Sequence, residues 1–391
     1  MSGVLLWIAL LAPSWDVGAG VGGGVVADAP VVRTDAWAGV AVGDFALALQ
    51  APLRWTVTDG ESTLRARDWD ERADFGRVLR FARHGDTLSV GVMGDMTLGH
   101  GTIVRRYHNG VDDDHHRVGV RLAHDFGGFG GEAFADQILD APVFGGHGWW
   151  RLGAGWTVGA TFAGDVAAPE TVRPVLDDRA RLEGTSRFVP TYGVDAGYAL
   201  AERWMLYADV NRVDDSAPGV HLGVEGEWLT GAWRPGLRAE AMYVGAGYDW
   251  AYFDTGYLID RWLPKAPRVA DLPATWGGRG AISVTYAEAL AVGAEYGDAG
   301  DGRAELTGWL RVPTRDLEVS AFGRNRYRQR RAELFDPSES LAALAARAHV
   351  GGPLWGTLTV ARGWRAAADE GEAAYRPFTE AALMFEADWG Q

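Results

Sequence analysis

The chain has 391 residues, of which 37 are basic and 52 acidic, so its formal net charge is −15. It contains no cysteine, which excludes disulfide scaffolds, thiolate metal sites, iron–sulfur clusters and cysteine nucleophiles. The acidic balance argues against a nucleic-acid-binding protein, because binding phosphates requires a basic surface. Hydrophobic residues make up 47% of the chain beside 54 glycines and 18 tryptophans, a combination unusual for a compact soluble core.

The first segment, Val4 to Ala12, is a short apolar run followed by Pro13, Ser14 and small residues. This layout predicts a secretory signal peptide over residues 1–19, with cleavage after Ala19 or near Ala12. The run is too short to cross a bilayer as a helix, which needs about 20 residues. No later stretch reaches that length without charges, so a membrane location would depend on strands.

The pattern that dominates the chain after residue 44 is alternation of apolar and polar residues over long stretches. It is clearest in residues 45–56, 87–98, 220–228, 305–312 and 380–389. Because successive strand side chains point to opposite faces, each stretch has one largely apolar face, and charged or polar residues stand on the other. A tilted strand needs ~9 to 11 residues to cross hydrocarbon, about twice the usual strand length in soluble sandwiches. The pattern therefore predicts a wall between lipid and an aqueous lumen.

Connections between the predicted strands alternate in length. Short turns lie near Gly85, Gly127, Gly153, Ala201, Gly231, Glu288, Pro313 and Gly351. Longer polar segments lie between them, at 58–74, 99–114, 165–187, 248–276, 328–338 and 365–372. Short turns at one end and long loops at the other are typical of an outer-membrane barrel.

Counting strands from Phe45 to Trp389 gives the predicted fold: all-β, a closed antiparallel transmembrane β-barrel of about 18 strands, with a range of roughly 16 to 20. We assign residues 44–391 to this barrel. Residues 20–43 form an N-terminal segment for which three roles are open: an extra strand, an interior plug or a periplasmic tail. Within it, residues 36–42 already have the pattern of a strand.

With these features the chain resembles bacterial outer-membrane β-barrels of the porin type. The resemblance covers nearly all of the chain after residue 44, and it is architectural, without a diagnostic motif. Members of this class end in an aromatic residue on the closing strand, whereas here Trp389 is followed by Gly390 and Gln391. The resemblance implies a location in the cell outer membrane, contact with outer-membrane lipid, and interfacial girdles formed by some of the aromatic residues.

The most distinctive local feature is a run of arginines that begins in one predicted strand. In an extended chain Arg324, Arg326, Arg328 and Arg330 project to one face. We predict that they face the lumen together with other charged residues: Arg54, Asp95, Glu225, Glu227, Arg311, Glu380 and Glu386. Charged rings commonly set pore selectivity, so the arginine row would attract anionic solutes. The alternative is a salt-bridged strut that stiffens the wall and narrows the lumen.

A second feature is the acidic and histidine-rich sequence Asp112, Asp113, Asp114, His115 and His116. Three carboxylates beside two imidazoles could bind a divalent metal ion, or an Asp–His pair could activate a water molecule for hydrolysis. A solvated loop with neither role is the simpler interpretation, because neighbouring loop residues point in different directions.

The long segment from Tyr248 to Trp276 is rich in aromatic residues and prolines. A loop of this length without structure of its own is uncommon unless it is functional. Because exposed aromatic residues at this density are costly, we expect it to fold into the lumen as a constriction rather than to form an external binding surface.

Together these features favour a porin-like outer-membrane channel for passive diffusion of small polar or anionic solutes through a charged lumen. We expect no enzymatic activity and no cofactor. Two alternatives are open: an outer-membrane hydrolase with an extracellular Asp/His site, and a closed structural or adhesion barrel. A soluble propeller would need repeats of about 40 to 50 residues, and the sequence has none. The sequence leaves open whether the lumen is open and whether copies form a homo-oligomer.

Overall fold

The computed structural model describes residues 13–26, 29–58, 61–70, 72–110, 117–174, 182–262, 269–287, 289–327, 340–369 and 372–390. The strand segments of the barrel wall are β1 (Ser14–Val26), β2 (Ala29–Val42), β3 (Phe45–Gln50), β4 (Leu53–Thr58), β5 (Glu61–Leu64), β6 (Leu79–His84), β7 (Leu88–Gly91), β8 (Gly119–Asp125), β9 (Phe129–Ala135), β10 (Val143–Gly153), β11 (Trp156–Pro169), β14 (Ser186–Ala201), β15 (Trp204–Val213), β16 (Gly219–Glu227), β17 (Trp233–Val244), β18 (Thr275–Tyr286), β19 (Leu290–Asp298), β20 (Ala304–Pro313), β21 (Leu317–Tyr327), β22 (Ser340–Gly351), β23 (Leu354–Asp369) and β24 (Glu372–Gly390).

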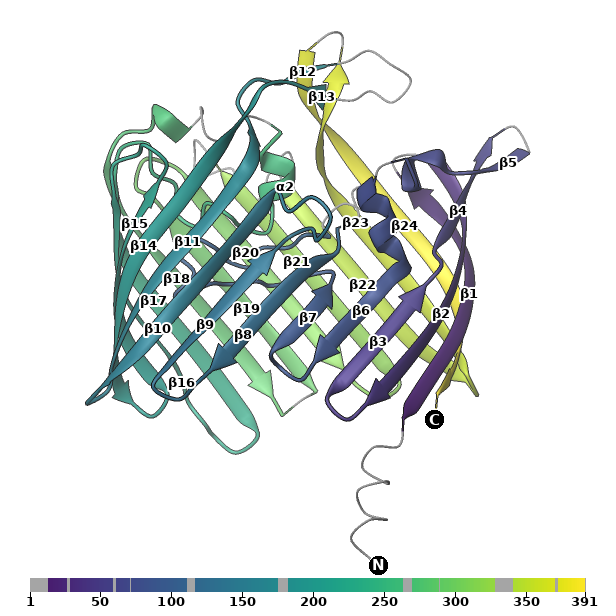
Figure 1. Ribbon diagram of the computed structural model, residues 1–391, viewed down its shortest axis with the longest axis horizontal. Coiled ribbons are helices and arrows are strands. Elements are labelled where there is room, and N and C mark those ends of the chain that lie inside the picture. Colours follow the sequence, from purple (N-terminus) through teal and green to yellow (C-terminus); the bar gives the residue numbers. More distant parts are fainter. Residues whose placement is uncertain are drawn as a thin grey trace, which may run out of the picture.

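In the described part of the chain these segments form one closed wall of 20 antiparallel strands, with β1 paired to β24 (Figure 1). β3 and β4 count as one strand because both pair with β2, and their partners β6 and β5 count as the next. Outside the wall lie the hairpin β12 (Arg173–Pro174) and β13 (Leu182–Glu183), the 3-10 helices η1 (Ala66–Asp68) and η2 (Arg72–Val78), and helix α2 (Tyr257–Asp260). No helix among the described residues is long and apolar enough to cross a membrane.

The N-terminal segment belongs to the wall. β1 pairs with β2 along its whole length and with β24 on its other side, so the wall begins at Ser14 and not at residue 44. The strands from Phe45 onward number 18, as predicted, and β1 and β2 add the other two. The pattern in β1 is hidden because its inward positions, such as Gly18 and Gly20, are glycines rather than polar residues.

The predicted signal peptide falls mostly outside the described residues, which begin at residue 13. Cleavage near Ala12 would leave β1 intact. Cleavage after Ala19 would instead remove six paired residues, Ser14 to Ala19, from the strand that closes the barrel. The signal peptide stays a prediction, and the strand pairing favours the earlier of its two cleavage positions.

The two ends of the barrel differ as the loop lengths predict. The start of β1, the end of β24 and the short turns lie at one end, which we call the short-turn end, and the long connections lie at the other (Figure 1). Two predicted boundaries are wrong. Most of residues 365–372 belong to the long hairpin of β23 and β24. The strand predicted over 87–98 ends at Gly91, whose φ of 143° suits a residue without a side chain, and the chain there leaves the wall.

The outward face of the wall is apolar and bounded by aromatic residues. On β17 and β18, Trp233 packs against Tyr286 with ring centroids 4.5 Å apart, and Tyr243 packs against Trp276 at 5.2 Å. Each strand has ten residue steps between its two aromatic residues. At about 3.4 Å per residue and a tilt of roughly 40°, they span about 26 Å of membrane thickness, close to the ~25 Å apolar band of transmembrane barrels. The wall is therefore that of an outer-membrane-type barrel.

An arginine placed on this band should destabilise the barrel in lipid. Ile282 is 64% exposed on the outward face of β18, between the two aromatic pairs. We expect Ile282→Arg to lower the free energy of unfolding from lipid vesicles by about 2–4 kcal/mol, measured by guanidinium chloride titration. The control is Ser283→Arg, whose side chain points into the lumen; equal losses in both variants would contradict the assigned faces.

Candidate functional site

Two long connections fold into the lumen. The first inserted loop comprises the described residues 92–110 and 117–118 between β7 and β8. The second inserted loop comprises the described residues 245–262 and 269–274 between β17 and β18. The first forms a hairpin in which the backbones of Met96 and Tyr107 exchange hydrogen bonds of 3.0 and 2.8 Å. The inward fold predicted for the aromatic segment that begins at Tyr248 is confirmed.

The second inserted loop adds an extended segment to the tip of the first. The amide of Ala251 donates to the carbonyl of Thr102 at 2.8 Å, and the amide of Phe253 donates to that of Ile103 at 3.0 Å. In return the amide of Arg105 donates to the carbonyl of Phe253 at 3.0 Å. The two loops therefore form one body, joined by backbone hydrogen bonds.

This body has its own apolar core inside the barrel. Its fully buried side chains are Leu98, Ile103, Val104, Tyr107, Tyr248, Tyr252, Phe253 and Tyr257. Rings of Phe253 and Tyr257 pack edge to face with centroids 4.7 Å apart. Because close-packed interiors resist rearrangement, this core stabilises the arrangement of the two inserted loops inside the barrel.

Tyrosine hydroxyls tie this core to the wall. The hydrogen-bonded pairs are Tyr107–Asp136 at 3.0 Å, Tyr257–Asp165 at 2.8 Å and Tyr248–His221 at 2.9 Å. Burial raises the pKa of all three tyrosines well above the ordinary value, so the hydroxyls keep their protons at neutral pH. Each can then act as a donor toward the wall.

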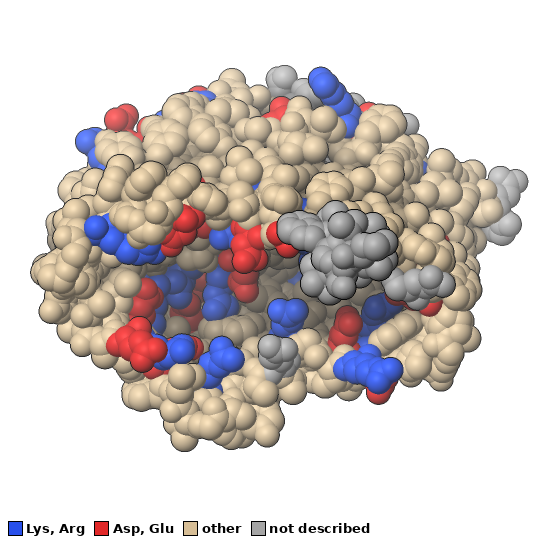
Figure 2. All heavy atoms as spheres, turned by 60° about the horizontal axis from the view of Figure 1, so that its bottom comes forward, with Lys and Arg blue, Asp and Glu red and all other residues tan. Residues whose placement is uncertain are grey.

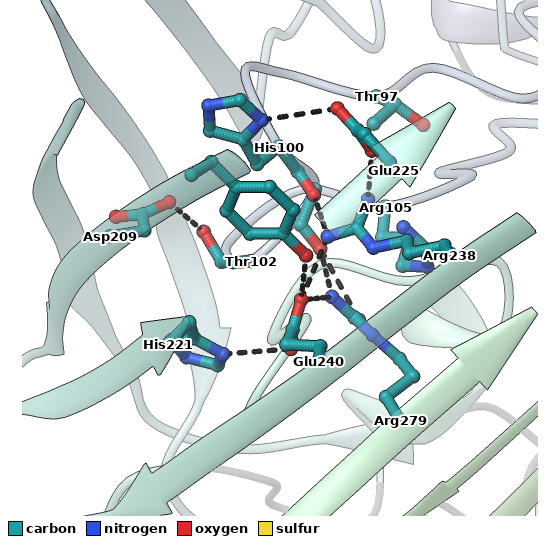
Figure 3. Close-up of polar contacts among 12 residues, drawn as sticks. Thr97, His100, Thr102, Arg105, Asp209, His221, Glu225, Arg238, Glu240 and Arg279 are labelled. Atoms are coloured by element: carbon teal, nitrogen blue, oxygen red, sulfur yellow. Dashed lines mark hydrogen bonds and ion pairs between the residues drawn. The ribbon is translucent and has the colours of Figure 1, made fainter. Parts of the chain in front are cut away.

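Beneath the loops, a network of charged side chains crosses the inward faces of β14 to β19 (Figure 3). At its centre Glu240 of β17 is 6% exposed. It accepts hydrogen bonds from Arg238 at 2.8 Å, from Arg279 at 2.9 Å and from the hydroxyl of Tyr207, and it hydrogen-bonds His221 at 2.9 Å. The negative charge of one carboxylate therefore stabilises two buried arginine cations, which would otherwise lack their shared partner.

The same network holds the tip of the first inserted loop. Its contacts with the wall are Arg238 to the carbonyl of His100, Arg279 to the carbonyl of Gly101 at 3.4 Å, Thr102 to Asp209, and Arg105 to Glu295 at 2.7 Å. Burial lowers the pKa of Arg105 to about 10, with Arg279 acting in the same direction and Glu295 opposing it. Arg105 remains a cation at neutral pH, so its pair with Glu295 is ionic.

The opposite half of the lumen is lined by small side chains. On β22 and β23 the inward positions include Ala343, Ala345, Thr359 and Ala361, of which Ala343 is exposed and Thr359 half-buried. By contrast, inward residues beneath the loops, such as Glu240, are nearly fully buried. Figure 2 shows the short-turn end hollowed, with charged side chains of both signs lining the hollow. The inward side chains named on β22 and β23 therefore occupy less of the lumen than those beneath the loops.

The structure places Arg324 in a strut. Its side chain is 6% exposed and donates to Asp254 of the second inserted loop at 2.6 Å. It also lies 3.6 Å from Asp260 and 3.4 Å from Glu305. Arg326 stands opposite Glu305 in the register of β20 and β21. Arg328 and Arg330 lie outside the described residues, so the arginine row beyond β21 stays a prediction.

Four of the other predicted lumen residues do face inward on the wall. Arg311 is exposed to the lumen, and Glu386 binds Arg347 at 3.2 Å. Glu380 is half-buried on β24. Glu225 lies 3.3 Å from His100 and 3.2 Å from Arg238, at the edge of the network beneath the first inserted loop.

Of the three remaining predicted lumen residues, Arg54 and Glu227 stand at inward positions of the wall and form ion pairs there, and only Asp95 lies off the wall. Arg54 is buried, because it forms a two-pronged ion pair with Asp68 of η1 at 2.6 and 2.7 Å. Asp95 lies on the first inserted loop and not on the wall, because β7 ends before it. Glu227 pairs with Arg203 near the short-turn end.

The residues proposed as a metal or hydrolytic site, Asp112 to His116, lie outside the described residues. Within the described ranges, no group of three or more histidine or acidic side chains is placed to hold a metal ion. The sequence does not predict the network around Glu240, because its members come from separate segments; Arg105 and Glu295 are 190 residues apart. The signal that could have pointed to part of it is the charged alternation of Arg238 and Glu240 on one strand.

No protein-family model and no curated protein sequence matches the chain. Among solved structures, it is similar to Pseudomonas aeruginosa OccK11 (OpdR), with 10% identity over 97% of this chain and 96% of that chain and a TM-score of 0.39. Acinetobacter baumannii OccAB2 has 10% identity over 97% and 98% of the two chains, with a TM-score of 0.38. A mutant of the Rh. blastica porin has 10% identity over 97% and 100%, with a TM-score of 0.33.

Proposed function

We propose that the protein is an outer-membrane channel through which small polar solutes, anions in particular, diffuse passively. The observation that carries the proposal is the division of the lumen. The two inserted loops fill one half and are fixed to the wall, while small, exposed residues such as Ala343 leave the other half free. A wall of 20 strands encloses a lumen wider than side chains alone can fill, so a passage beside the loops is expected.

Four arginines, of which Arg311, Arg80 and Arg83 are exposed and Arg106 is half-buried, support the preference for anions. Arg311 faces the free half of the lumen and makes no ion pair with a carboxylate in the described part of the chain. Arg106 of the first inserted loop stacks its guanidinium over Trp309, 3.4 Å from the ring centroid. Arg80 and Arg83 of β6 are also exposed, and each stacks on an aromatic ring of the inner face. Cations that are not neutralised by nearby acids raise the local concentration of anions.

Planar-bilayer recording tests the proposal. Purified protein, shown to be folded by its resistance to detergent at room temperature, should give discrete conductance steps that grow with KCl concentration. Folded protein that inserts without such steps would overturn the channel and favour a closed structural barrel. The residues on which the hydrolase alternative depends, Asp112 to His116, lie outside the described residues. The proposal holds for each chain whether or not copies form a homo-oligomer.

The contribution of one arginine, Arg311, to the preference for anions can be measured. We expect Arg311→Ser to lower the anion-to-cation permeability ratio roughly two- to five-fold, because one charge acting through ~4–8 Å of water contributes about 0.5–1 kcal/mol. Arg324→Ser should leave this ratio unchanged and increase the current noise, because it removes the bond to Asp254 instead. Reversal potentials in a KCl gradient measure the ratio; an unaltered value in Arg311→Ser would count against selectivity at that position.

A further inference from the structure

His100 lies at the tip of the first inserted loop, between two carboxylates of the wall. Its Nδ1 is 3.3 Å from Oε1 of Glu225 on β16, and its Nε2 is 3.6 Å from Oδ1 of Asp195 on β14. The imidazole stacks on the ring of Tyr207 on β15, with centroids 4.2 Å apart and planes 9° from parallel. Three neighbouring strands therefore surround one side chain of the loop, and Figure 3 shows the contact with Glu225.

The other charged groups around this contact have partners of their own. These pairs are Asp195 with His147 at 3.1 Å, Arg238 with Glu225 at 3.2 Å and with Glu240 at 2.8 Å, Arg105 with Glu295 at 2.7 Å, and Asp209 with Thr102. Imidazole is the side-chain type that gains or loses a proton between about pH 5 and 8. The cluster holds three imidazoles, because His221 pairs with Glu240 at 2.9 Å and His147 with Asp195. Only His100 belongs to the loop, so among the three its proton alone can change the charge of the tip.

We propose that His100 is a pH-dependent latch that fixes the tip of the first inserted loop to β14 and β16. The protonated ring carries an N–H on both nitrogens and a positive charge, so both nitrogens are attracted to the carboxylates that face them. The neutral ring carries one N–H, and its other nitrogen presents a lone pair to a carboxylate. Proton binding therefore favours the attached tip, and the added attachment is lost as the pH rises.

Loosening of the tip would affect the passage, because the same hairpin continues into Arg106, which stacks on Trp309 at the edge of the free half of the lumen. We expect a fixed tip to give a quiet current and a loosened tip to give a noisier one. This consequence rests on the proposed channel function, whereas the latch itself does not.

Amide hydrogen exchange tests the latch without any current. For protein in detergent micelles, exchange of the peptide covering residues 98–105 is compared at pH 6 and pH 8 after correction for the intrinsic rates. We expect protection to be roughly tenfold higher at pH 6, the effect of one charge-assisted hydrogen bond. His100→Gln should show the lower protection at both pH values. An equal protection of the wild type at both, or a pH difference that survives in His100→Gln, would overturn the latch.

The matched control is His84→Gln, because His84 is exposed at the short-turn end of β6 and lies on the outward face. It should retain the wild-type pH difference, and loss of the difference in this variant would overturn the assignment to His100.

Unchanged exchange of peptides from β15 to β17 shows that a variant barrel is folded. In planar bilayers, wild-type noise should rise from pH 6 to pH 8. If the folded protein gives no conductance, the proposed channel function is wrong. The latch is then still tested by the hydrogen-exchange measurement.

Discussion

Ala345→Trp should reduce the single-channel conductance by roughly half or more, whereas Ala346→Trp should leave it close to the wild-type value. The register of β22 explains the difference. Ala345 stands opposite Ser320 and Thr359 on the inward face, and Ala346 stands opposite Val319 on the outward face. An indole at the first position enters the free half of the lumen, and at the second it points into lipid.

These two variants form a close pair, since the same substitution is made at neighbouring positions of one strand. Tryptophan is tolerated on the lipid-facing side of membrane proteins, so both variants should fold. The measurement is the step conductance in planar bilayers at fixed KCl concentration. If Ala345→Trp conducts like the wild type, solutes do not pass along β22, and the passage must be sought through the inserted loops.

Glu240→Ala should detach the inserted loops from the wall. Removing this carboxylate leaves Arg238 and Arg279 buried without their shared partner and takes an acceptor from Tyr207. Breaking a buried ion pair by removing one partner costs about 3–5 kcal/mol. Because the loops narrow the lumen, we expect a larger and noisier conductance together with a lower free energy of unfolding.

The control for this prediction is Glu227→Ala. Glu227 pairs with Arg203, and both side chains are more than a third exposed, so the expected loss is below about 1 kcal/mol. Guanidinium chloride unfolding and bilayer recording compare the two variants under the same conditions. Similar stability and similar conductance in both would show that the network around Glu240 does not hold the loops.

Much of the wall could be predicted because lipid imposes a simple rule on every strand. In β3 and β4 the outward positions include Phe45, Leu47 and Leu49, and this alternation is visible in the sequence alone. The rule fails at β1, whose inward side chains must be small: a methyl group added to Gly18 would meet the ring of Trp37 at 2.0 Å. A strand whose inward positions are glycines shows no alternation of polar and apolar residues in the sequence.

The site could be predicted less well because its contacts join distant segments. The alternation places Arg324 on the inward face, but its partner Asp254 is 70 residues earlier, on a loop whose path the sequence does not specify. The sequence therefore leaves open both a selectivity element and a salt-bridged strut, and in the structure Arg324 itself connects the wall to the second inserted loop. Arg311, two positions from the end of β20, has no such loop beside it and stays exposed.

The junction between the two inserted loops has a consequence for assembly of the barrel. Val104 and Phe253 form a parallel bridge, and each belongs to a different hairpin of the wall. Closing a segment of this length costs more chain entropy than forming any neighbouring hairpin, so the bridge should form only after both hairpins are in place. A newly inserted molecule would then be leaky until this last contact is made. The permeability of a membrane that holds newly inserted copies would therefore depend on how fast this contact forms.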